Sequence, residues 1–165
     1  MPASAAAVGQ NRAMRVSAKA DYAVRAAAEL AVVAGAGPVK GERIAEAQRI
    51  PLKFLENILA ELKHDGIVQS QRGAEGGYWL ARPADQITVA DVIRAVDGPL
   101  ANVRGERPEA VEYAGSANHL LDVWIAVRAS LRQVLERVTL ADLVAGELPA
   151  WLHTLTDDPE AWLSH

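Results

Sequence analysis

The chain of 165 residues contains no cysteine. This absence excludes disulfide bonds, zinc–thiolate sites, thiolate-ligated iron–sulfur clusters and cysteine nucleophiles. Aromatic residues are scarce, at 5%, whereas 50% of the residues are hydrophobic and many of these are alanine. A composition rich in alanine and poor in aromatic residues favours a mainly helical fold. The length suits one domain of ordinary size with a substantial core.

Long apolar runs are also missing. The longest uncharged apolar stretch, residues 30–39, has ten residues, whereas a membrane-spanning helix needs about 20. The apolar residues 5–8 are too few for a secretory signal, and Arg12 lies on the wrong side of them. We therefore expect a cytoplasmic protein with no membrane partner. Residues 1–13 are expected to form a disordered leader, and Met1 and Met14 both remain candidates for the native start.

A net positive charge is absent as well. The formal net charge is −4 at pH 7, which argues against a simple polybasic nucleic-acid binder. The charges are unevenly placed, because residues 14–98 carry 11 basic and 11 acidic side chains, and residues 99–165 carry 5 basic and 10 acidic ones. An acidic half is poorly suited to face DNA, whereas a neutral half can present a local binding surface.

A pair of helices joined by a short turn is predicted in the neutral part. Ser17 is a typical N-cap, and apolar residues at helical spacing predict a helix over residues 18–34. A short helix over about residues 42–48 follows. After a turn at residues 49–51, a third helix is predicted to run to about residue 64, with Pro51 at its first position. A helix, a three-residue turn and a helix are typical of a helix-turn-helix.

A glycine-rich hairpin is predicted directly after this helix pair. Residues 67–72 and 78–80 are expected to form its strands, and Gly73, Gly76 and Gly77 make its tip flexible. A hairpin in this place is the wing of a winged-helix domain. The neutral part is therefore predicted to be a winged helix-turn-helix domain.

Further helices are predicted after the wing. Thr88 and Thr139 each precede an aspartate with the spacing of a capping box, and each predicts a short helix. Residues 101–116 are expected to form a loop, and residues 117–137 a long helix with a heptad seam. The apolar positions of this seam, predicted to lie in a dimer interface, are Leu120, Trp124, Val127, Leu131, Val134, Leu135 and Val138.

Five segments match, in order, the motifs of one protein family. They are MRVSAKADYAVRAAAELA at residues 14–31, IPLKFLENILAELKHDGIV at residues 50–68, RGAEGGYWLARP at residues 72–83, ITVADVIRAVDGPL at residues 87–100, and LDVWIAV with RASLRQVLERVTLADL within residues 121–143. On these segments the chain resembles the IscR/NsrR/CymR group of bacterial winged-helix transcription regulators, the Rrf-two family. The resemblance covers about residues 14–148 and favours Met14 as the native start.

The resemblance implies a mainly α fold with a small β wing. It places a winged helix-turn-helix DNA-binding domain at residues 14–98, a loop at residues 99–116, a dimerisation helix with a short capped helix at residues 117–148, and a tail at residues 149–165. It implies a homodimeric, sequence-specific transcription regulator, expected to be a repressor, that binds double-stranded promoter DNA at a palindromic site. Its effector, a small molecule or a protein, is not named by the sequence.

The chain departs from the family in one loop. Many members carry three cysteines between the Asp-Gly-Pro turn and the dimerisation helix, and bind an iron–sulfur cluster there. The corresponding residues 101–118 contain no cysteine. His119, Glu106, Glu109 and Glu112 lie in or near this loop, but a cluster is not expected without thiolates. We therefore expect no cofactor and no metal, and a solvated acidic loop instead.

The predicted recognition helix offers three outward residues near its start, where side chains enter the major groove. Lys53 suits guanine or a phosphate, Glu56 suits the amino group of cytosine, and Asn57 suits adenine or a phosphate. A solvated helix face is the alternative reading, and the family resemblance favours DNA contact. Phe54, the only phenylalanine, is expected to pack between helices with partial contact to the DNA backbone.

The wing and the first helix supply the remaining predicted DNA contacts. The resemblance implies that Arg72 reaches into the minor groove, where narrow A·T-rich tracts concentrate negative potential. Ser17, Lys19 and Tyr22 are candidate phosphate contacts at the start of the first helix, and Tyr22 is equally suited to core packing. Glu75 departs from the pattern, because it adds a negative charge beside DNA. The expected wing residues are Gly73, Glu75, Gly76, Gly77 and Tyr78.

The long helix predicts how two copies act together. One winged helix binds a half-site weakly, whereas two copies joined by this helix bind a palindrome through a high effective concentration. Trp124 and Leu131 are the expected anchors of that interface. Packing of the same residues within one chain remains an alternative, and one long helix can do both.

Two other classes of protein are alternatives to a DNA-binding regulator. A winged-helix protein-interaction module with no DNA role is favoured slightly by the zero net charge of residues 14–98 and by Glu75 on the wing. A regulator controlled by a partner protein rather than a small ligand is a further alternative. An enzyme is not expected, because the four histidines are scattered and the wing glycines lack the Lys and Ser/Thr that follow in a phosphate-binding loop.

Overall fold

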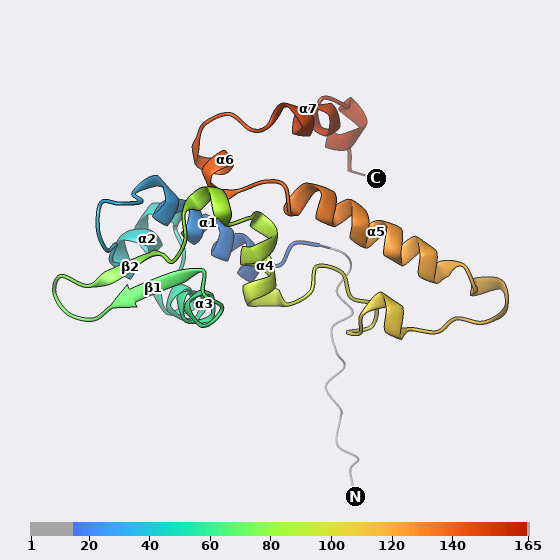
Figure 1. Cartoon of the computed structure of the whole chain (residues 1–165), viewed down its shortest axis with the longest axis horizontal. Coiled ribbons are helices and arrows are strands. Elements are labelled where there is room, and N and C mark those ends of the chain that lie inside the picture. The colour runs from blue at the N-terminus through green and yellow to red at the C-terminus, as the bar shows by residue number, and fades with distance from the viewer. Residues whose placement is uncertain (1–14, 165) are drawn as a thin grey trace, which may run out of the picture.

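The computed structural model describes residues 15–164, and the expected leader at residues 1–13 lies outside them. Figure 1 shows a winged body and an arm formed by one long helix. In order, the elements are α1 (Ala18–Val32), α2 (Gly41–Gln48), α3 (Leu52–His64), β1 (Val68–Gln71), β2 (Gly77–Leu80), α4 (Val89–Asp97), α5 (Leu120–Leu135), α6 (Leu140–Val144) and α7 (Ala150–Thr156). Short 3-10 turns lie at Ala84–Gln86, Pro108–Ala110, Gly115–Ala117 and Pro159–Trp162.

Helix α1 is the centre of the body, and α2, α3, α4 and α6 all pack against it. Its buried face consists of five alanines and one leucine, and small side chains let several helices approach closely. Ser17 caps the helix as predicted, with its Oγ accepting a hydrogen bond from the Ala20 N–H at 3.0 Å. The buried core is completed mainly by the inner faces of α2, α3 and α4.

The turn between α2 and α3 differs from its prediction by one residue. Pro51 is the N-cap of α3 and not its first helical residue, with φ −55° and ψ 126°. Arg49 ends α2 in the left-handed conformation, with φ 53° and ψ 47°. This left-handed residue reverses the chain within three residues, so α3 can lie across α2 with Leu55, Ile58, Leu59 and Leu62 buried beneath it.

The wing is an antiparallel pair of strands with a third backbone contact. Val68 pairs with Leu80, and Gln71 pairs with Gly77. Val39 adds two backbone hydrogen bonds to Tyr78, each 2.8 Å long. The loop before α2 therefore lies directly against β2 and anchors the wing to the helix-turn-helix.

We expect replacement of Gly77 by alanine to lower the free energy of unfolding by more than 2 kcal/mol, roughly. Its φ is +151°, and an added Cβ would lie 2.6 Å from the carbonyl oxygen of Val39. Gly37→Ala is the matched control, because Gly37 also has a positive φ, +96°, but has open space around it. It should cost only about 1 kcal/mol, the cost of the strained backbone alone. Equal losses in chemical denaturation would show that the contact with Val39 is unimportant.

Both predicted capping boxes are present, and they lie next to each other. The side chains of Thr88 and Thr139 each accept a hydrogen bond from the backbone N–H of the aspartate three residues later. The carboxylate of that aspartate, Asp91 or Asp142, accepts one from the backbone N–H of the threonine. Backbone hydrogen bonds of 2.9 Å join Val89 to Val138 and Leu140 to Ile87. The chain thus returns to the body after α5. Val138 is only 5% exposed in the single chain, so it packs in the chain's own core rather than on a free seam.

Helix α5 is shorter than predicted and protrudes from the body. It begins at Leu120 rather than residue 117, because residues 115–117 form a 3-10 turn. Figure 1 shows it as an arm leading away from the winged body. None of its residues is buried, although its composition is largely apolar. No helix within residues 15–164 is long and apolar enough to cross a membrane.

The tail at residues 149–165, for which the sequence predicted no helix, contains α7 and a 3-10 turn that ends at Trp162. The guanidinium of Arg137 lies 4.0 Å from the centre of the Trp151 ring, a cation–π contact that ties α7 to the end of α5. A helix of 7 residues is too short to show a clear periodicity, which is why the pattern was not recognised.

Candidate nucleic-acid interface

The start of α3 presents its polar side chains to solvent. Lys53, Glu56 and Asn57 are all exposed, as predicted, and the apolar face of the helix is buried against the body. No side chain caps the amino end of α3. The first N–H groups of the helix are therefore free to bind an anion such as a DNA phosphate.

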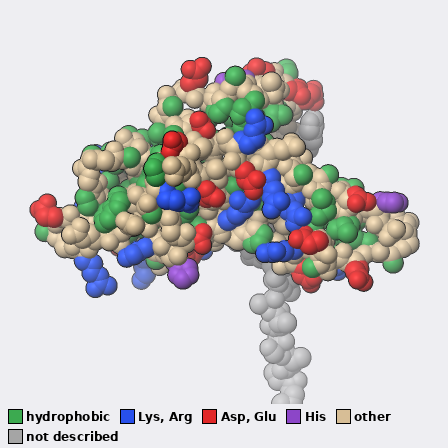
Figure 2. Space-filling view, viewed as in Figure 1, with side chains coloured by type: hydrophobic (Ala, Val, Ile, Leu, Met, Phe, Trp, Pro, Cys, Tyr) green, Lys and Arg blue, Asp and Glu red, His purple; other side chains and the backbone are tan. Residues whose placement is uncertain are grey.

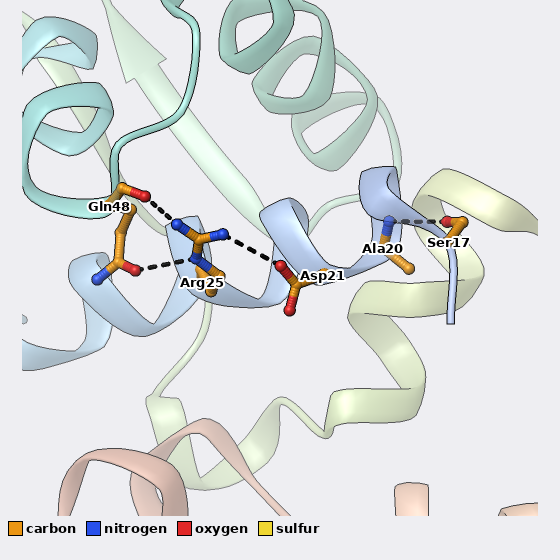
Figure 3. A network of polar contacts seen from close by, with 5 residues as sticks. All are labelled: Ser17, Ala20, Asp21, Arg25 and Gln48. Atoms are coloured by element: carbon orange, nitrogen blue, oxygen red, sulfur yellow. Dashed lines mark hydrogen bonds and ion pairs between the residues drawn. The ribbon is translucent and has the colours of Figure 1, made fainter. Parts of the chain in front are cut away.

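A polar network holds the turn of the helix-turn-helix in place (Figure 3). Arg25 on α1 donates from Nε to the Gln48 side chain at 3.1 Å and from its Nη2 to the Gln48 carbonyl oxygen. Its Nη1 pairs with Asp21 at 3.1 Å. The Gln48 amide donates in turn to Glu29. Because Gln48 is the last residue of α2, this network fixes the position from which α3 starts.

The residues predicted to contact DNA from the start of α1 interact with other side chains of the same chain. Lys19 forms a 2.6 Å ion pair with Glu61 of α3, and the hydroxyl of Ser17 donates to Asp97 at the end of α4. The rings of Tyr22 and Phe54 meet edge to face, with centres 5.6 Å apart. These residues therefore pack α1 against α3 and α4.

Exposure differs between these contacts on α1 and α3. Phe54 remains 42% exposed, while Tyr22 is half-buried against the core. The Lys19 side chain is 34% exposed and Ser17 is half-buried. Each retains some exposed surface, so a phosphate contact from any of them would have to share the side chain with its internal partner.

The wing tip projects from the body with its charged residues exposed. Arg72, Gly73 and Glu75 are exposed, whereas Gly76 and Gly77 are buried in the turn and Tyr78 packs partly on the core. Gly73 has a φ of +104°, which only glycine adopts readily. Figure 2 shows Lys and Arg side chains projecting at the lower-left edge, the end of the molecule where Figure 1 places β1 and α3.

Sequence reasoning missed three residues that position this surface. Lys40 donates to the Gly73 carbonyl oxygen at 2.7 Å and so supports the wing tip from the loop before α2. Lys63 donates to Ser70 at 2.8 Å and joins the end of α3 to β1. Arg25 holds the turn, as described above. In the sequence, the only signal for Arg25 is its position on the side of the first helix that faces the second. Nothing in the sequence indicates the partners of Lys40 and Lys63.

Residues 16–146 match the family model of Rrf2, described as an iron-dependent transcriptional regulator. The chain belongs to the Rrf2 family. It is an HTH-type transcriptional regulator with a winged-helix fold, which confirms the resemblance seen in the sequence.

Relatives with similar sequences match this chain along most of its length. A protein of Mycobacterium tuberculosis (strain ATCC 25618 / H37Rv), whose name assigns it to the HTH-type transcriptional regulators, is 51% identical over 148 residues, 90% of this chain and 92% of its own. CymR of Bacillus subtilis is 34% identical over 142 residues, 84% of this chain and 98% of its own.

Two solved structures have the same architecture. That of CymR, the global cysteine regulator of B. subtilis, gives a TM-score of 0.69 at 34% identity and covers 81% of this chain and 98% of CymR. That of IscR from T. potens gives a TM-score of 0.64 at 35% identity and covers 92% of this chain and 93% of IscR. The match extends over the winged body and the arm.

The iron dependence in the family's description does not fit the donor groups of this chain. The chain has no cysteine, and residues 15–164 contain no group of three or more His, Asp or Glu placed to hold a metal ion. Nδ1 of His119 lies 3.6 Å from Oδ2 of Asp122, and Oε2 of Glu109 lies 2.6 Å from Nη1 of Arg128. The pKa of Glu109 is held below its usual range, first by a hydrogen bond from its own backbone and then by Arg128. The Glu109 carboxylate is therefore engaged in an ion pair with Arg128 rather than in a metal site.

The predicted dimer seam lies mostly on the free arm. Leu120, Trp124, Val127, Leu131, Val134 and Leu135 are all half-buried in the single chain. The indole N–H of Trp124 donates to the Tyr113 hydroxyl at 2.9 Å, which orients its ring on the helix. An apolar helix without a buried residue is a typical surface for association with another chain.

Proposed function

We propose that the chain is a homodimeric, sequence-specific DNA-binding repressor that acts in the cytoplasm on palindromic promoter sites. The observation that supports it most is the exposed start of α3, where Lys53, Glu56 and Asn57 stand beside an uncapped helix end. Side chains in this position of a helix-turn-helix enter the major groove. The proposal includes no catalytic step and no iron–sulfur cluster.

The wing adds a second contact in this proposal. Arg72 would enter the adjacent minor groove, with Gly73 allowing close approach of the backbone. Ser17, Lys19 and Tyr22 would contribute at most phosphate contacts, because their side chains already have partners in the chain. Phe54 would contact the sugar–phosphate backbone with the exposed part of its ring.

The half-buried seam of α5 supports the dimer. Leu120, Trp124, Val127, Leu131, Val134 and Leu135 would be covered by the same helix of a second copy. Val138 is left out of this interface because it is buried in its own chain. Two winged helix-turn-helix domains (here called the reading domains) joined in this way would recognise two half-sites related by the dimer axis.

The test is selection of genomic DNA fragments by the purified full-length protein. We expect enrichment of a small set of promoter fragments that share a palindromic motif, and weaker binding as salt rises. The Arg72→Ala protein should bind the selected fragments about tenfold more weakly, because one minor-groove contact is lost. A folded, dimeric protein that enriches no sequence would contradict the proposal and favour a protein-interaction module.

A further inference from the structure

A polar pocket lies between the winged body and the arm, outside the surface proposed for DNA. Its volume is about 530 Å³, within the range of small-molecule sites. It is bordered by the end of α3, by α4, by the loop after α4 and by α5. Its charged lining residues are Asp65, Arg94, Arg107, Glu109, Arg128 and Arg132.

Arginine is concentrated here against the trend of the surrounding sequence. Residues 99–165 contain only 5 basic side chains against 10 acidic ones, yet Arg107, Arg128 and Arg132 line this one pocket and Arg94 joins them from α4. Figure 2 shows Lys and Arg side chains gathered at the centre of the molecule, between α4 and α5. The pocket is therefore a local positive site in the acidic half.

The carboxylates of the chain do not neutralise this arginine cluster. Glu109 pairs with Arg128 at 2.6 Å. Glu136 is shared, because it pairs with Arg94 and also with Arg132 at 3.6 Å. Arg107 forms no close ion pair within the described residues, and its charge acts on Glu109 from a greater distance, where it helps to lower the pKa of that carboxyl. Even when Asp65 is included, four guanidinium groups face three carboxylates.

Guanidinium groups arranged around a pocket recognise one kind of ligand well. Their planar, forked N–H groups match the two oxygens of a carboxylate or phosphate. The Arg128 side chain is only 22% exposed, and partial burial strengthens such hydrogen bonds. We propose that this pocket binds a small metabolite carrying a phosphate or carboxylate group, and that this ligand is the effector of the regulator proposed above.

The position of the pocket provides a route from ligand to DNA. Asp65 is the C-cap of α3, the proposed recognition helix, and Arg94 lies on α4, which packs on α1 and α3. Arg128 and Arg132 lie on α5, the proposed dimerisation helix. A ligand that bridges these elements sets the angle between reading domain and arm. It thereby sets the spacing of the two reading domains, and DNA affinity changes if one angle is preferred.

The first experiment measures binding of two probes, inorganic phosphate and succinate, to the full-length protein without DNA. Titration calorimetry is done at constant ionic strength with chloride as the balancing anion. We expect saturable binding of at least one probe, weakened at least tenfold in Arg107→Gln, because a charged hydrogen-bond donor is lost without breaking an ion pair. Arg104→Gln is the matched control, since Arg104 is exposed in the same loop but does not line the pocket. It should bind like the wild type.

The two probes separate the sources of the shared chemistry. Binding of phosphate alone indicates a phosphorylated metabolite, and binding of succinate alone indicates a carboxylate. Arg72→Ala should keep probe binding, which separates this pocket from anion binding at the DNA surface. The inference is overturned if neither probe binds, or if Arg107→Gln binds as tightly as the wild type.

The second experiment adds DNA. The probe that binds should change the affinity of the wild-type protein and of Arg104→Gln for a selected promoter fragment by at least threefold at constant ionic strength, and leave that of Arg107→Gln unchanged. An equal response of the two variants would contradict the role as effector. A protein that binds its promoter normally and no probe would overturn this inference while leaving the proposed function intact.

Discussion

Replacing Lys53 with glutamate is expected to weaken binding to a selected promoter fragment about 100-fold. The change removes a cation at the exposed start of α3 and places an anion there. The contact to a base edge or phosphate is lost, and the new carboxylate repels the DNA backbone. The lost contact alone accounts for about 1–3 kcal/mol. Mobility-shift or fluorescence-anisotropy titrations at fixed salt give the affinity.

Lys63→Glu provides the matched control for this substitution. It makes the same change of charge on the same helix, but at the last turn, where Lys63 donates to Ser70 of β1. We expect less than a fivefold loss, because side chains at this end of a recognition helix leave the groove. If both variants lost affinity equally, the effect would come from net charge alone, and the assignment of Lys53 to the interface would be wrong.

Replacing Leu131 with aspartate is expected to convert the protein to a monomer. Leu131 lies in the middle of the half-buried seam of α5. In a dimer, the carboxylate would be buried opposite its own copy, which is strongly unfavourable for an unpaired charge. Sedimentation velocity should show the loss of mass. Affinity for a palindromic fragment should fall at least 100-fold, because the second half-site no longer gains effective concentration.

Ala129→Asp separates this effect from simple charge repulsion. Ala129 lies on the same helix, two residues away, and is exposed. The same negative charge there should leave the dimer and its DNA affinity close to those of the wild type. A Leu131→Asp protein that remained dimeric would place the dimer interface elsewhere. Circular dichroism of both variants checks that the body remains folded, which is expected because α5 contributes no buried residue.

The two halves of the chain have distinct electrostatic roles. The neutral winged body places exposed cations at the start of α3 and on the wing, so its net charge of zero conceals a local surface suited to DNA. In the proposed complex the acidic half would keep the arm away from the phosphates, while Arg107, Arg128 and Arg132 form a positive site within it. Net charge counted over a segment therefore predicts neither surface.

Features that depend on near neighbours were predicted correctly from the residues. The caps at Ser17, Thr88 and Thr139 were identified, because each depends on a hydrogen bond to a residue three positions away. The helix-turn-helix and the wing were also recognised. Their apolar spacing and glycines report directly on backbone conformation and on the buried face. The order of these motifs was sufficient to identify the family.

Features that depend on distant residues became clear only in the folded chain. The Ser17 hydroxyl meets Asp97, 80 residues away, and Lys19 meets Glu61, so two predicted DNA contacts have internal partners. Val138 looked like part of the seam, but the bond between Val89 and Val138 draws it into the core.

The arginine pocket is the clearest example of a feature that depends on residues distant in the sequence. It joins side chains from α4, the following loop and α5, which no local pattern connects. Periodicity and capping report the conformation of a segment, because their interactions span three or four residues. Which side chains share a pocket depends on how the segments pack, and that is a property of the whole core.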